Sequence, residues 1–254
     1  KSLTDCLGKF GGSKSRWSWS GGMIWVGPRM TFDADYTKVA RQRSGSEGWE
    51  NTRQITTAHG RAARGDRTIE VASASGIEPG QFVILRWTDP GDRSFLTHIA
   101  GMANADFGGL GRSPWMWPVD VARVDGETLH LKQPLRADIR PAWRVAVLSI
   151  GEHVRECGVE RLAVKFPRHK VQKHLMDVGY NGPFLNNAID CWVRDVVVEN
   201  ADVGYQVACS KNVTAARLRI TGPQRAHHAT ACRHSTHDTL MEDFVIDCPV
   251  HHGI

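Results

Sequence analysis

Apolar and polar residues alternate in short segments throughout the C-terminal part of the chain. Alternation with a period of two is typical of a β-strand with one face in a core, and no helical period of 3.6 competes with it here. We therefore predict a strand at each alternating segment. The apolar positions are Leu162, Val164 and Phe166; Val196 and Val198; Ala216, Leu218 and Ile220; and Phe244, Ile246 and Cys248.

A second pattern repeats beside these strands. Similar six-residue copies begin at Asn186, Gly204, His227 and His251, with offsets of 18, 23 and 24 residues, and the first three copies end on cysteine. A period in this range is typical of stacked solenoid coils. Together with the alternating strands, it predicts an all-β fold with a parallel β-helix over residues 151–254.

The N-terminal part of the chain lacks this period. Residues 17–26 have a strand pattern of aromatic and apolar residues, whereas residues 31–64 have the composition of a loop. Residues 65–150 predict a small β-rich unit, with a hairpin turn at 125–127 and a long loop over 88–118. The expected division is N-terminal β-helix strand (1–30), inserted loop and β-rich subdomain (31–150), and β-helix coils (151–254).

One coil carries a resemblance to a known family. The run Ala-Ile-Asp-Cys-Trp-Val-Arg-Asp-Val-Val-Val from Ala188 to Val198 is followed one coil later by Lys211-Asn212-Val213-Thr214. These residues resemble the right-handed β-helix proteins of the pectate-lyase-like superfamily, over residues 151–254 and the strand at 17–26. The resemblance implies a right-handed parallel β-helix. Because the superfamily includes polysaccharide lyases, glycoside hydrolases, epimerases, phage tailspikes and non-catalytic surface proteins, it implies no single reaction.

Charge and composition narrow the choice of partner. The 254 residues hold 32 Lys and Arg against 27 Asp and Glu, a net charge of +5 at pH 7, with 12 histidines that can add charge in mild acid. This balance favours an anionic partner such as an acidic polysaccharide, and no basic run is dense enough for nucleic-acid binding. No stretch approaches about 18 consecutive apolar residues, so we expect no membrane span.

The chain ends and the cysteines bear on localisation. The chain begins at Lys1 without an initiator Met, and the fourth copy stops short at Ile254, so we expect further residues at both ends and a secreted or periplasmic protein. The six cysteines show no CxxC metal spacing and leave the redox compartment undecided. Four of them share one repeat position and are expected to form a buried row of free thiols. They are Cys157, Cys191, Cys209 and Cys232.

Aligning the copies at their cysteines places histidines in one column. If the cysteines face the core, Asn186, His227 and His251 face outward, with His227 one coil spacing (about 4.8 Å) from His251. We call this predicted column the histidine ladder. Two interpretations stay open: a stacked row of satisfied polar residues, or a binding or catalytic site. The neighbouring residues at the strand starts are Tyr205, His228 and His252.

The third coil carries extra length after its cysteine. The surplus is a loop over residues 233–238 that contains Arg233, His234 and His237, and Arg225 precedes the histidine pair of the same coil. Because loops on a rigid scaffold often carry sites, we expect this loop and the histidine ladder to form one cleft.

Such a cleft has the groups that β-elimination of a uronic acid needs. A cation neutralises the carboxylate, and a base of near-neutral pKa then removes the adjacent C5 proton. Arg225 and Arg233 are candidate carboxylate ligands, and His227, His234 or His237 is the candidate base. Hydrolysis needs two facing carboxylates instead, and none falls in the ladder. The available acidic residues are Asp190, Asp202, Glu242 and Asp243.

Metal binding and aromatic stacking are two further options. His228 and His252, with the ladder histidines and His237, could supply neutral imidazoles to zinc or another transition metal. The resemblance implies calcium as an alternative, although calcium sites of that family use Asp-rich clusters and none is evident here. Trp115 and Trp117 could present two indole faces to sugar rings or anchor the long loop as a small core.

We therefore predict a secreted right-handed parallel β-helix that cleaves an acidic polysaccharide by β-elimination, with calcium or zinc as candidate cofactors. The alternatives are a glycoside hydrolase on the same fold and a non-catalytic glycan-binding or surface module. The predicted catalytic residues are His227, Arg233, His234 and His237. The predicted substrate-binding residues are Arg225, His251, Asn186, Tyr205, Trp115 and Trp117.

Overall fold

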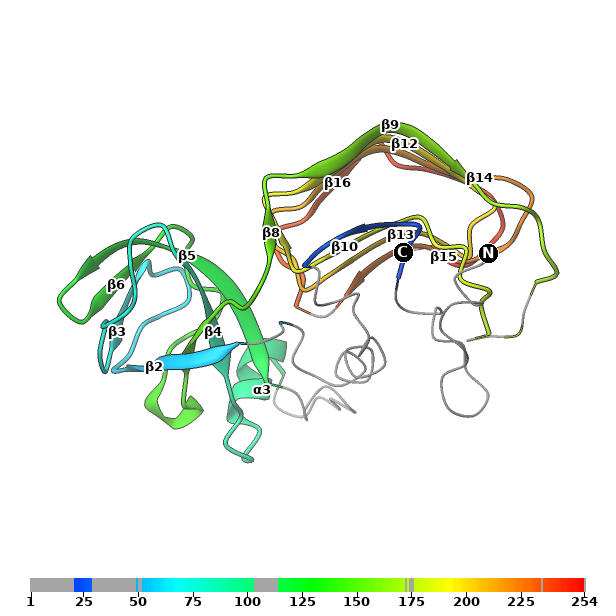
Figure 1. Ribbon diagram of the computed structural model, residues 1–254. Helices are drawn as coiled ribbons and strands as arrows, with labels where there is room; N and C mark the ends of the chain where they lie inside the picture. The colour runs from blue at the N-terminus through cyan, green and yellow to red at the C-terminus, as the bar shows by residue number, and fades with distance from the viewer. Residues whose placement is uncertain are drawn as a thin grey trace. The chain divides into compact units, whose positions relative to one another are not determined.

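The chain folds into two units of β-structure. The computed structural model describes residues 21–28, 49, 52–102, 114–171, 173, 176–233 and 235–253. Contacts divide the chain into one unit of Lys1–Arg41 with His153–Ile254 and another of Gln42–Glu152. Strands dominate the described residues of both units, and the helical elements among them are α3 (Ser94–Ala100) and the 3-10 turn η3 (Pro141–Trp143) (Figure 1). The described part of the chain is therefore all-β, as predicted.

Two parallel sheets build the unit that contains the C-terminal residues. In the first sheet the strands pair in the order β1-β10-β13-β15-β18. These are β1 (Ile24–Val26), β10 (Pro183–Asn186), β13 (Val203–Ala208), β15 (Ala226–Arg233) and β18 (Val250–His252). In the second sheet the order is β16-β14-β12-β9, and β17 also pairs with β14. These are β9 (Gly158–Lys165), β12 (Trp192–Glu199), β14 (Thr214–Thr221), β16 (Leu240–Glu242) and β17 (Val245–Asp247).

The strands of each sheet stack coil upon coil. Figure 1 shows the two sheets as separate layers, with β8 (Val154–Arg155) at one side between them. β8 pairs in parallel with β11 (Ala188–Ile189) of the next coil. Each coil thus hydrogen-bonds to its neighbouring coils, and we call this part of the chain the solenoid unit. That it is a parallel β-helix stays a prediction. The hand of the coils stays a prediction.

The core of this unit lies between the two sheets. Val196 and Val198 of β12 and Leu218 and Ile220 of β14 are buried, whereas Val197 between them is exposed. The alternation predicted for these two strands is confirmed. The same apolar cluster also contains Leu185, Tyr205, Val207 and Ala229 of the first sheet.

The strands of the second sheet bend at a common position. Arg161, Asp195, Arg217 and Asp243 all have positive φ, between 52° and 55°, and follow one another in the paired strands. Their charges alternate from coil to coil. Arg217 donates to both carboxylate oxygens of Asp195, at 2.6 and 2.8 Å, and this bond lowers the pKa of Asp195. An exposed ion pair of this kind contributes little stability. The positive-φ residues occupy matching register positions, so the bend recurs at the same point in successive coils.

The register differs from the predicted alignment of the copies. Asn186 pairs with Ala208, 22 residues on, and Val203 pairs with His228, 25 residues on, so the predicted offsets of 18 and 23 are wrong. His228 pairs with His252 at the predicted offset of 24. The cysteines used for the alignment lie at or near turns, where coils differ in length. Because both errors are even numbers of residues, the predicted alternation stays in phase.

The predicted row of four cysteines is reduced to one neighbouring pair. The Sγ atoms of Cys157 and Cys191 lie 3.7 Å apart, and burial raises the pKa of Cys191 to about 11. Cys232 pairs with Val207, whereas Cys209 follows the end of β13. Among the described residues, Cys157, Cys191, Cys232 and Cys248 are free thiols.

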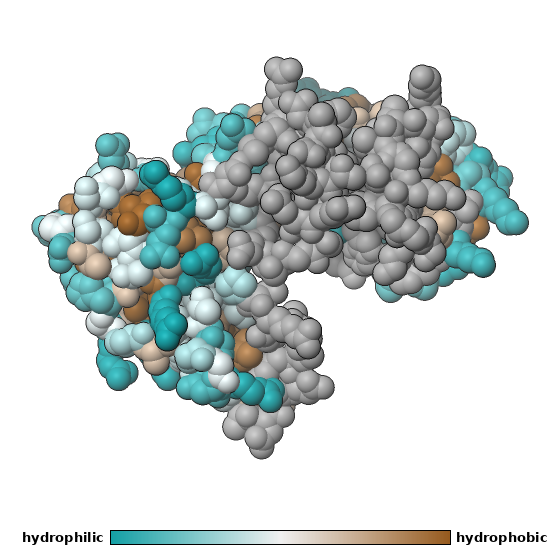
Figure 2. Space-filling view, turned by 60° about the horizontal axis from the view of Figure 1, so that its bottom comes forward, coloured by the Kyte–Doolittle hydropathy of each residue, from teal (hydrophilic) through white to brown (hydrophobic). Residues whose placement is uncertain are grey.

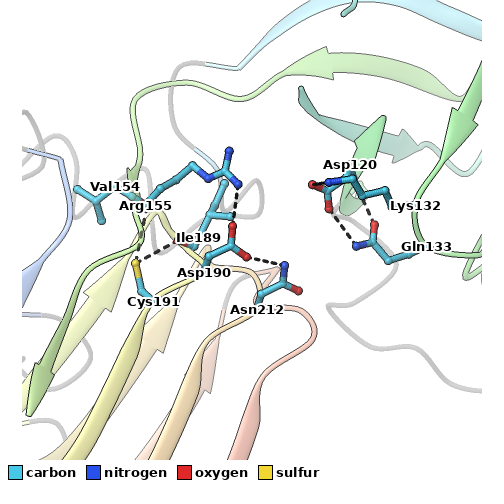
Figure 3. A network of polar contacts seen from close by, with 9 residues as sticks. All are labelled: Asp120, Lys132, Gln133, Val154, Arg155, Ile189, Asp190, Cys191 and Asn212. Carbon is cyan, nitrogen blue, oxygen red and sulfur yellow. Dashed lines mark hydrogen bonds and ion pairs between the residues drawn. The ribbon is translucent and has the colours of Figure 1, made fainter. Parts of the chain in front are cut away.

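A polar stack holds the turn between β11 and β12. Asp190 accepts hydrogen bonds from Arg155 of the preceding coil and Asn212 of the next, at 2.7 and 2.9 Å (Figure 3). Asp190 and Asn212 both have positive φ, which Asp and Asn tolerate better than most residues. The same corner is thereby repeated in successive coils.

The second unit is a closed antiparallel barrel with the strand order β2-β3-β6-β5-β4-β7. Its strands are β2 (Arg53–His59), β3 (Thr68–Val71), β4 (Phe82–Trp87), β5 (Trp115–Asp125), β6 (Thr128–Leu131) and β7 (Ala146–Ser149). The hairpin predicted at residues 125–127 joins β5 to β6 and is confirmed. Inside the barrel unit, Asp120 accepts a hydrogen bond from Gln133 at 2.9 Å (Figure 3).

The long loop predicted over residues 88–118 contains a helix and the start of a strand among its described residues. α3 occupies its middle, and β5 begins at Trp115. Asp89 orders the approach to α3, because its carboxylate accepts amide hydrogen bonds from Phe95 and Leu96 at 3.0 and 3.2 Å. Residues 103–113 lie outside the described part of the chain.

The close stacking of coils predicts that Gly204→Ala destabilises the protein. A Cβ at Gly204 would lie 2.6 Å from the Ala229 oxygen and 2.7 Å from two Ile220 carbons. Overpacking of this kind costs about 1–3 kcal/mol. We expect a lower free energy of unfolding in denaturant titration. Gly253→Ala is the matched control, because nothing lies within 4 Å of its added Cβ; equal stability of the two variants would contradict the prediction.

Candidate functional site

A cavity of about 250 Å³ opens at the start of β15, within the solenoid unit. It is lined mainly by ionisable side chains from four segments: the connection after β9, the residue before β13, the start of β15 and the start of β18. We call this space the cavity. Its ionisable lining residues are His169, Lys173, Asp177, Asp202, Arg225, His227 and His251.

A buried carboxylate holds His227. The Nδ1 atom of His227 lies 2.7 Å from Oδ2 of Asp177, and both side chains are over nine-tenths buried. When an ionised Asp177 accepts a hydrogen bond from Nδ1–H, the neutral ring carries its lone pair on Nε2. The pair therefore has the hydrogen-bonded arrangement of an oriented general base, with the Nε2 atom of His227 buried in this structure.

A second carboxylate, Asp202, organises the opposite part of the lining. Its Oδ2 accepts amide hydrogen bonds from Gly179 and Tyr180 at 2.8 and 3.0 Å, and its Oδ1 lies 3.0 Å from Nε2 of His169. The hydrogen bond to Asp202 raises the pKa of His169, although partial burial works against it. The Nδ1 of His169 faces the Lys170 carbonyl at 3.0 Å, so a protonated ring satisfies both acceptors.

Arg225 and Lys173 bring positive charge to the cavity, and His169 adds to it when protonated. Arg225 donates from Nη2 to Nδ1 of His251 at 2.7 Å. This bond requires a lone pair on that nitrogen and so favours a neutral His251. The guanidinium and the imidazole are thereby held together at the cavity edge, where an anionic ligand can reach both.

Four imidazoles meet where β15 and β18 begin. We call His227, His228, His251 and His252 the four-imidazole cluster. Ring centroids are 4.5 Å apart for His227 and His228, 4.7 Å for His228 and His252, and 5.7 Å for His227 and His251. Burial lowers the pKa of His228 to about 4, with smaller contributions from the neighbouring histidines. His228 is therefore neutral near pH 7.

A backbone irregularity brings consecutive rings to one side of the strand. Neighbours in a regular strand point to opposite faces. Here the amides of both His227 and His228 donate to the carbonyl oxygen of Asp202, at 2.7 and 3.2 Å. Two residues opposite one resemble a β-bulge, which redirects side chains and recurs near active sites.

The structure places part of the histidine ladder as expected. His227 lies beside His251 in register, next to the paired His228 and His252. Asn186 is not in this column, because it pairs with Ala208, and its buried side chain bonds Asn187 at 2.9 Å.

Tyr205 belongs to the core and not to a surface. Its side chain is fully buried in the apolar cluster between the sheets, and burial raises the pKa of its phenol. A substrate therefore cannot reach Tyr205, and the predicted substrate-binding role of Tyr205 is wrong for this reason.

The loop residues are not brought to the cavity. Arg233 ends β15, six residues after His227, which separates them by about 20 Å along an extended strand. The guanidinium of Arg233 donates a hydrogen bond to the side-chain oxygen of Gln206 at 2.9 Å. The backbone of His237 forms an isolated parallel β-bridge with Lys211. His234 lies outside the described residues. Among the described residues, Arg233 and His237 therefore do not line the cavity, although the Arg233 charge is near enough to help lower the pKa of His228.

The two tryptophans lie in a strand of the barrel. Trp117 is buried in the barrel core opposite Leu85, whereas Trp115 is 38% exposed opposite Trp87. The expected pair of exposed indoles in a loop is therefore absent at these two positions. Figure 2 shows the apolar side chains of the barrel as separate patches among polar ones on the face in view. Packing in the barrel core accounts for the burial of Trp117.

The sequence did not indicate four of the seven ionisable residues that line the cavity. His169, Lys173 and Asp177 lie in a connection with no repeat, so no periodic signal marks them. Asp202 was available as a carboxylate but was placed outside the ladder. Asp202 lies next to His227 because β13 and β15 pair with an offset of 25 residues and not the predicted 23.

Comparison with known proteins finds similarity to solved structures alone. No protein-family model matches the chain, and no curated protein matches it. The Gp54 tailspike of Acinetobacter baumannii bacteriophage AP22, solved with an A. baumannii capsular saccharide, is similar with 11% identity, a TM-score of 0.38, and coverage of 78% of this chain and 34% of that chain.

Two Pseudomonas phage tailspikes are also similar. The protein gp49 of phage LKA1 has 14% identity, a TM-score of 0.45, and coverage of 80% and 39%. The protein gp61 of phage phi297 has 15% identity, a TM-score of 0.33, and coverage of 78% and 34%. The chain thus spans between about a third and two fifths of these proteins. Separately, no helix of the described residues is long and apolar enough to cross a membrane.

The contact with Asp202 predicts that His169 titrates above the usual histidine range. Asp202→Asn removes the charge, so the pKa of His169 should fall. A raised folded-state pKa stabilises the protein below the unfolded-state pKa, and this contribution is lost as pH rises through the folded-state value. Histidine NMR titration and unfolding across this window measure both effects. Asp247→Asn, at an exposed ion pair, is the control; an unchanged His169 pKa in Asp202→Asn would contradict the prediction.

Proposed function

We propose that the solenoid is a right-handed parallel β-helix whose cavity binds an acidic polysaccharide and cleaves it by β-elimination. The observation that carries this proposal is the buried pair of His227 and Asp177 at a cavity that is also lined by the positively charged side chains of Arg225 and Lys173. An oriented base beside positive charge is the combination that proton removal next to a carboxylate requires.

The positively charged side chains of the cavity bind the carboxylate of the uronate. Arg225 and Lys173 line the cavity, and His169 adds a positive charge when protonated. Positive charge on the sugar carboxylate stabilises the negative charge that develops when the C5 proton leaves. The guanidinium of Arg225 has the fork geometry for two hydrogen bonds to one carboxylate.

His227 transfers the proton. Nε2 of His227 takes the C5 proton, the C–H electron pair forms a double bond between C4 and C5, and the C4–O4 bond breaks. The same imidazolium then gives its proton to O4, so the reaction needs no external acid. Asp177 stabilises the imidazolium in between, as an orienting carboxylate does in catalytic triads.

Hydrolysis is the second candidate, because Asp177 and Asp202 both line the cavity. Hydrolysis uses one carboxyl as an acid and another as a base or nucleophile. Here both oxygens of Asp202 already face His169 and two backbone amides, and Asp177 faces His227. These contacts suit carboxylates that orient histidines, which favours elimination.

We also propose that the protein acts outside the cytoplasm, either secreted or in the periplasm, where long polysaccharides are found. Measurement of protein and activity in medium, periplasmic and cytoplasmic fractions of the native source tests this placement.

The reaction is tested by incubating the full chain with a panel of uronate polysaccharides and following the ultraviolet absorbance of the unsaturated product. We expect His227→Ala to lower kcat about 10²–10⁴-fold, the usual contribution of a general base. Asp177→Asn should lower kcat as well, while Arg225→Ala should mainly raise KM. His153→Ala, at an exposed histidine of the same unit, should leave activity unchanged.

Each other outcome points to a different function. New reducing ends without the absorbance change would show hydrolysis. Binding of a polysaccharide with neither product would show a glycan-binding module. Full activity in folded His227→Ala would remove the cavity as the site of the reaction.

A further inference from the structure

The four-imidazole cluster holds three possible ligand atoms in one place. Single nitrogens of His227, His228 and His252 all lie within 4.8 Å of one another. His227 and His228 are buried, whereas His252 is exposed, so the group is open to solvent on one side. The parallel register of β15 and β18 and the shared carbonyl of Asp202 create this grouping.

Imidazoles of this kind select a particular class of metal. Neutral histidine nitrogens suit zinc and similar divalent transition metals, whereas calcium takes oxygen ligands. Three protein ligands with one open position form the usual coordination of an accessible zinc ion. A zinc–nitrogen distance of about 2.0–2.1 Å places such nitrogens roughly 3.4 Å apart. Small ring rotations, above all of the exposed His252, would close the difference.

A carboxylate already supports one of the three rings. A metal-bound histidine commonly donates a hydrogen bond from its other ring nitrogen to a carboxylate. This hydrogen bond orients the ring and strengthens it as a ligand. Asp177 makes this contact with Nδ1 of His227, so Nε2 is the nitrogen that would coordinate.

We propose that His227, His228 and His252 bind a zinc ion, or a divalent ion of similar chemistry, at the edge of the cavity. Asp177 orients His227 toward the ion. His251 lies beside His252, with ring centroids 4.3 Å apart, but its Nδ1 accepts from Arg225, so His251 is not part of the ligand set.

The proposed ion acts as an inhibitor of the elimination reaction. This consequence rests on the proposed function, in which Nε2 of His227 takes the C5 proton. The same lone pair cannot accept a proton while it coordinates a metal. Zinc binding and proton removal therefore exclude each other at one atom.

Direct binding tests the site without any substrate. The full chain is treated with a chelator, dialysed and titrated calorimetrically with zinc chloride, and with calcium chloride for contrast. We expect one zinc ion per chain and no calcium binding at this site. Cobalt(II) should give the visible absorption of a tetrahedral site.

Variants locate the site. His252→Ala, at an exposed position, should weaken zinc binding at least tenfold and remove the cobalt spectrum. Asp177→Asn should weaken zinc binding about 10–100-fold, the usual effect of removing a supporting carboxylate. His153→Ala is the matched control and should bind as the wild type does. Zinc should inhibit the wild type, whereas His252→Ala should keep its activity and resist inhibition.

The outcomes separate this proposal from the proposed function. Unchanged zinc affinity in His252→Ala, or equal binding of calcium and zinc, would overturn the metal site. Zinc binding without inhibition would overturn its inhibitory role. Absence of lyase activity on every polysaccharide would count against the proposed function, while the calorimetric and cobalt results would still decide the metal site.

Discussion

The site depends on how the backbone pairs at Asp202. The carbonyl of this residue accepts the amides of His227 and His228, and its carboxylate holds the amides of Gly179 and Tyr180. One residue thus joins β15 to the connection that precedes β10. This double attachment helps to hold the strand that carries the histidines beside the segment that carries their carboxylate partner.

Parallel pairing explains why the histidines gather. A pair of adjacent histidines at the start of β15 is repeated 24 residues later at the start of β18. Hydrogen bonding of the two strands converts this repeat into four rings with neighbouring centroids between 4.3 and 5.8 Å apart. The non-repeating connection then adds Asp177. Repeated and non-repeated segments therefore contribute different parts of the site: the coils supply imidazoles and the connection supplies a carboxylate that orients one of them.

The sequence predicted the strands better than the register. Val196, Val198, Leu218 and Ile220 are buried as their alternation indicated, because burial of one face is a local property of a strand. The register depends on how many residues each turn contains, and turns between coils vary in length without a clear sequence signal. The ladder was therefore correct at His227 and His251, where the offset is 24, and wrong at Asn186, where it is 22.

The sequence by itself determined the all-β character, the strands of the solenoid unit and the repeat of the histidine pairs. Only the tertiary structure decided which other groups meet them. It brought Asp177, Asp202 and His169 to the same cavity as His227, and it left Arg233, at the far end of β15, and His237 outside the lining of that cavity. The physical reason is that side-chain periodicity is encoded over a few residues, whereas the approach of segments 25 or 50 residues apart depends on turn lengths and backbone pairing across coils.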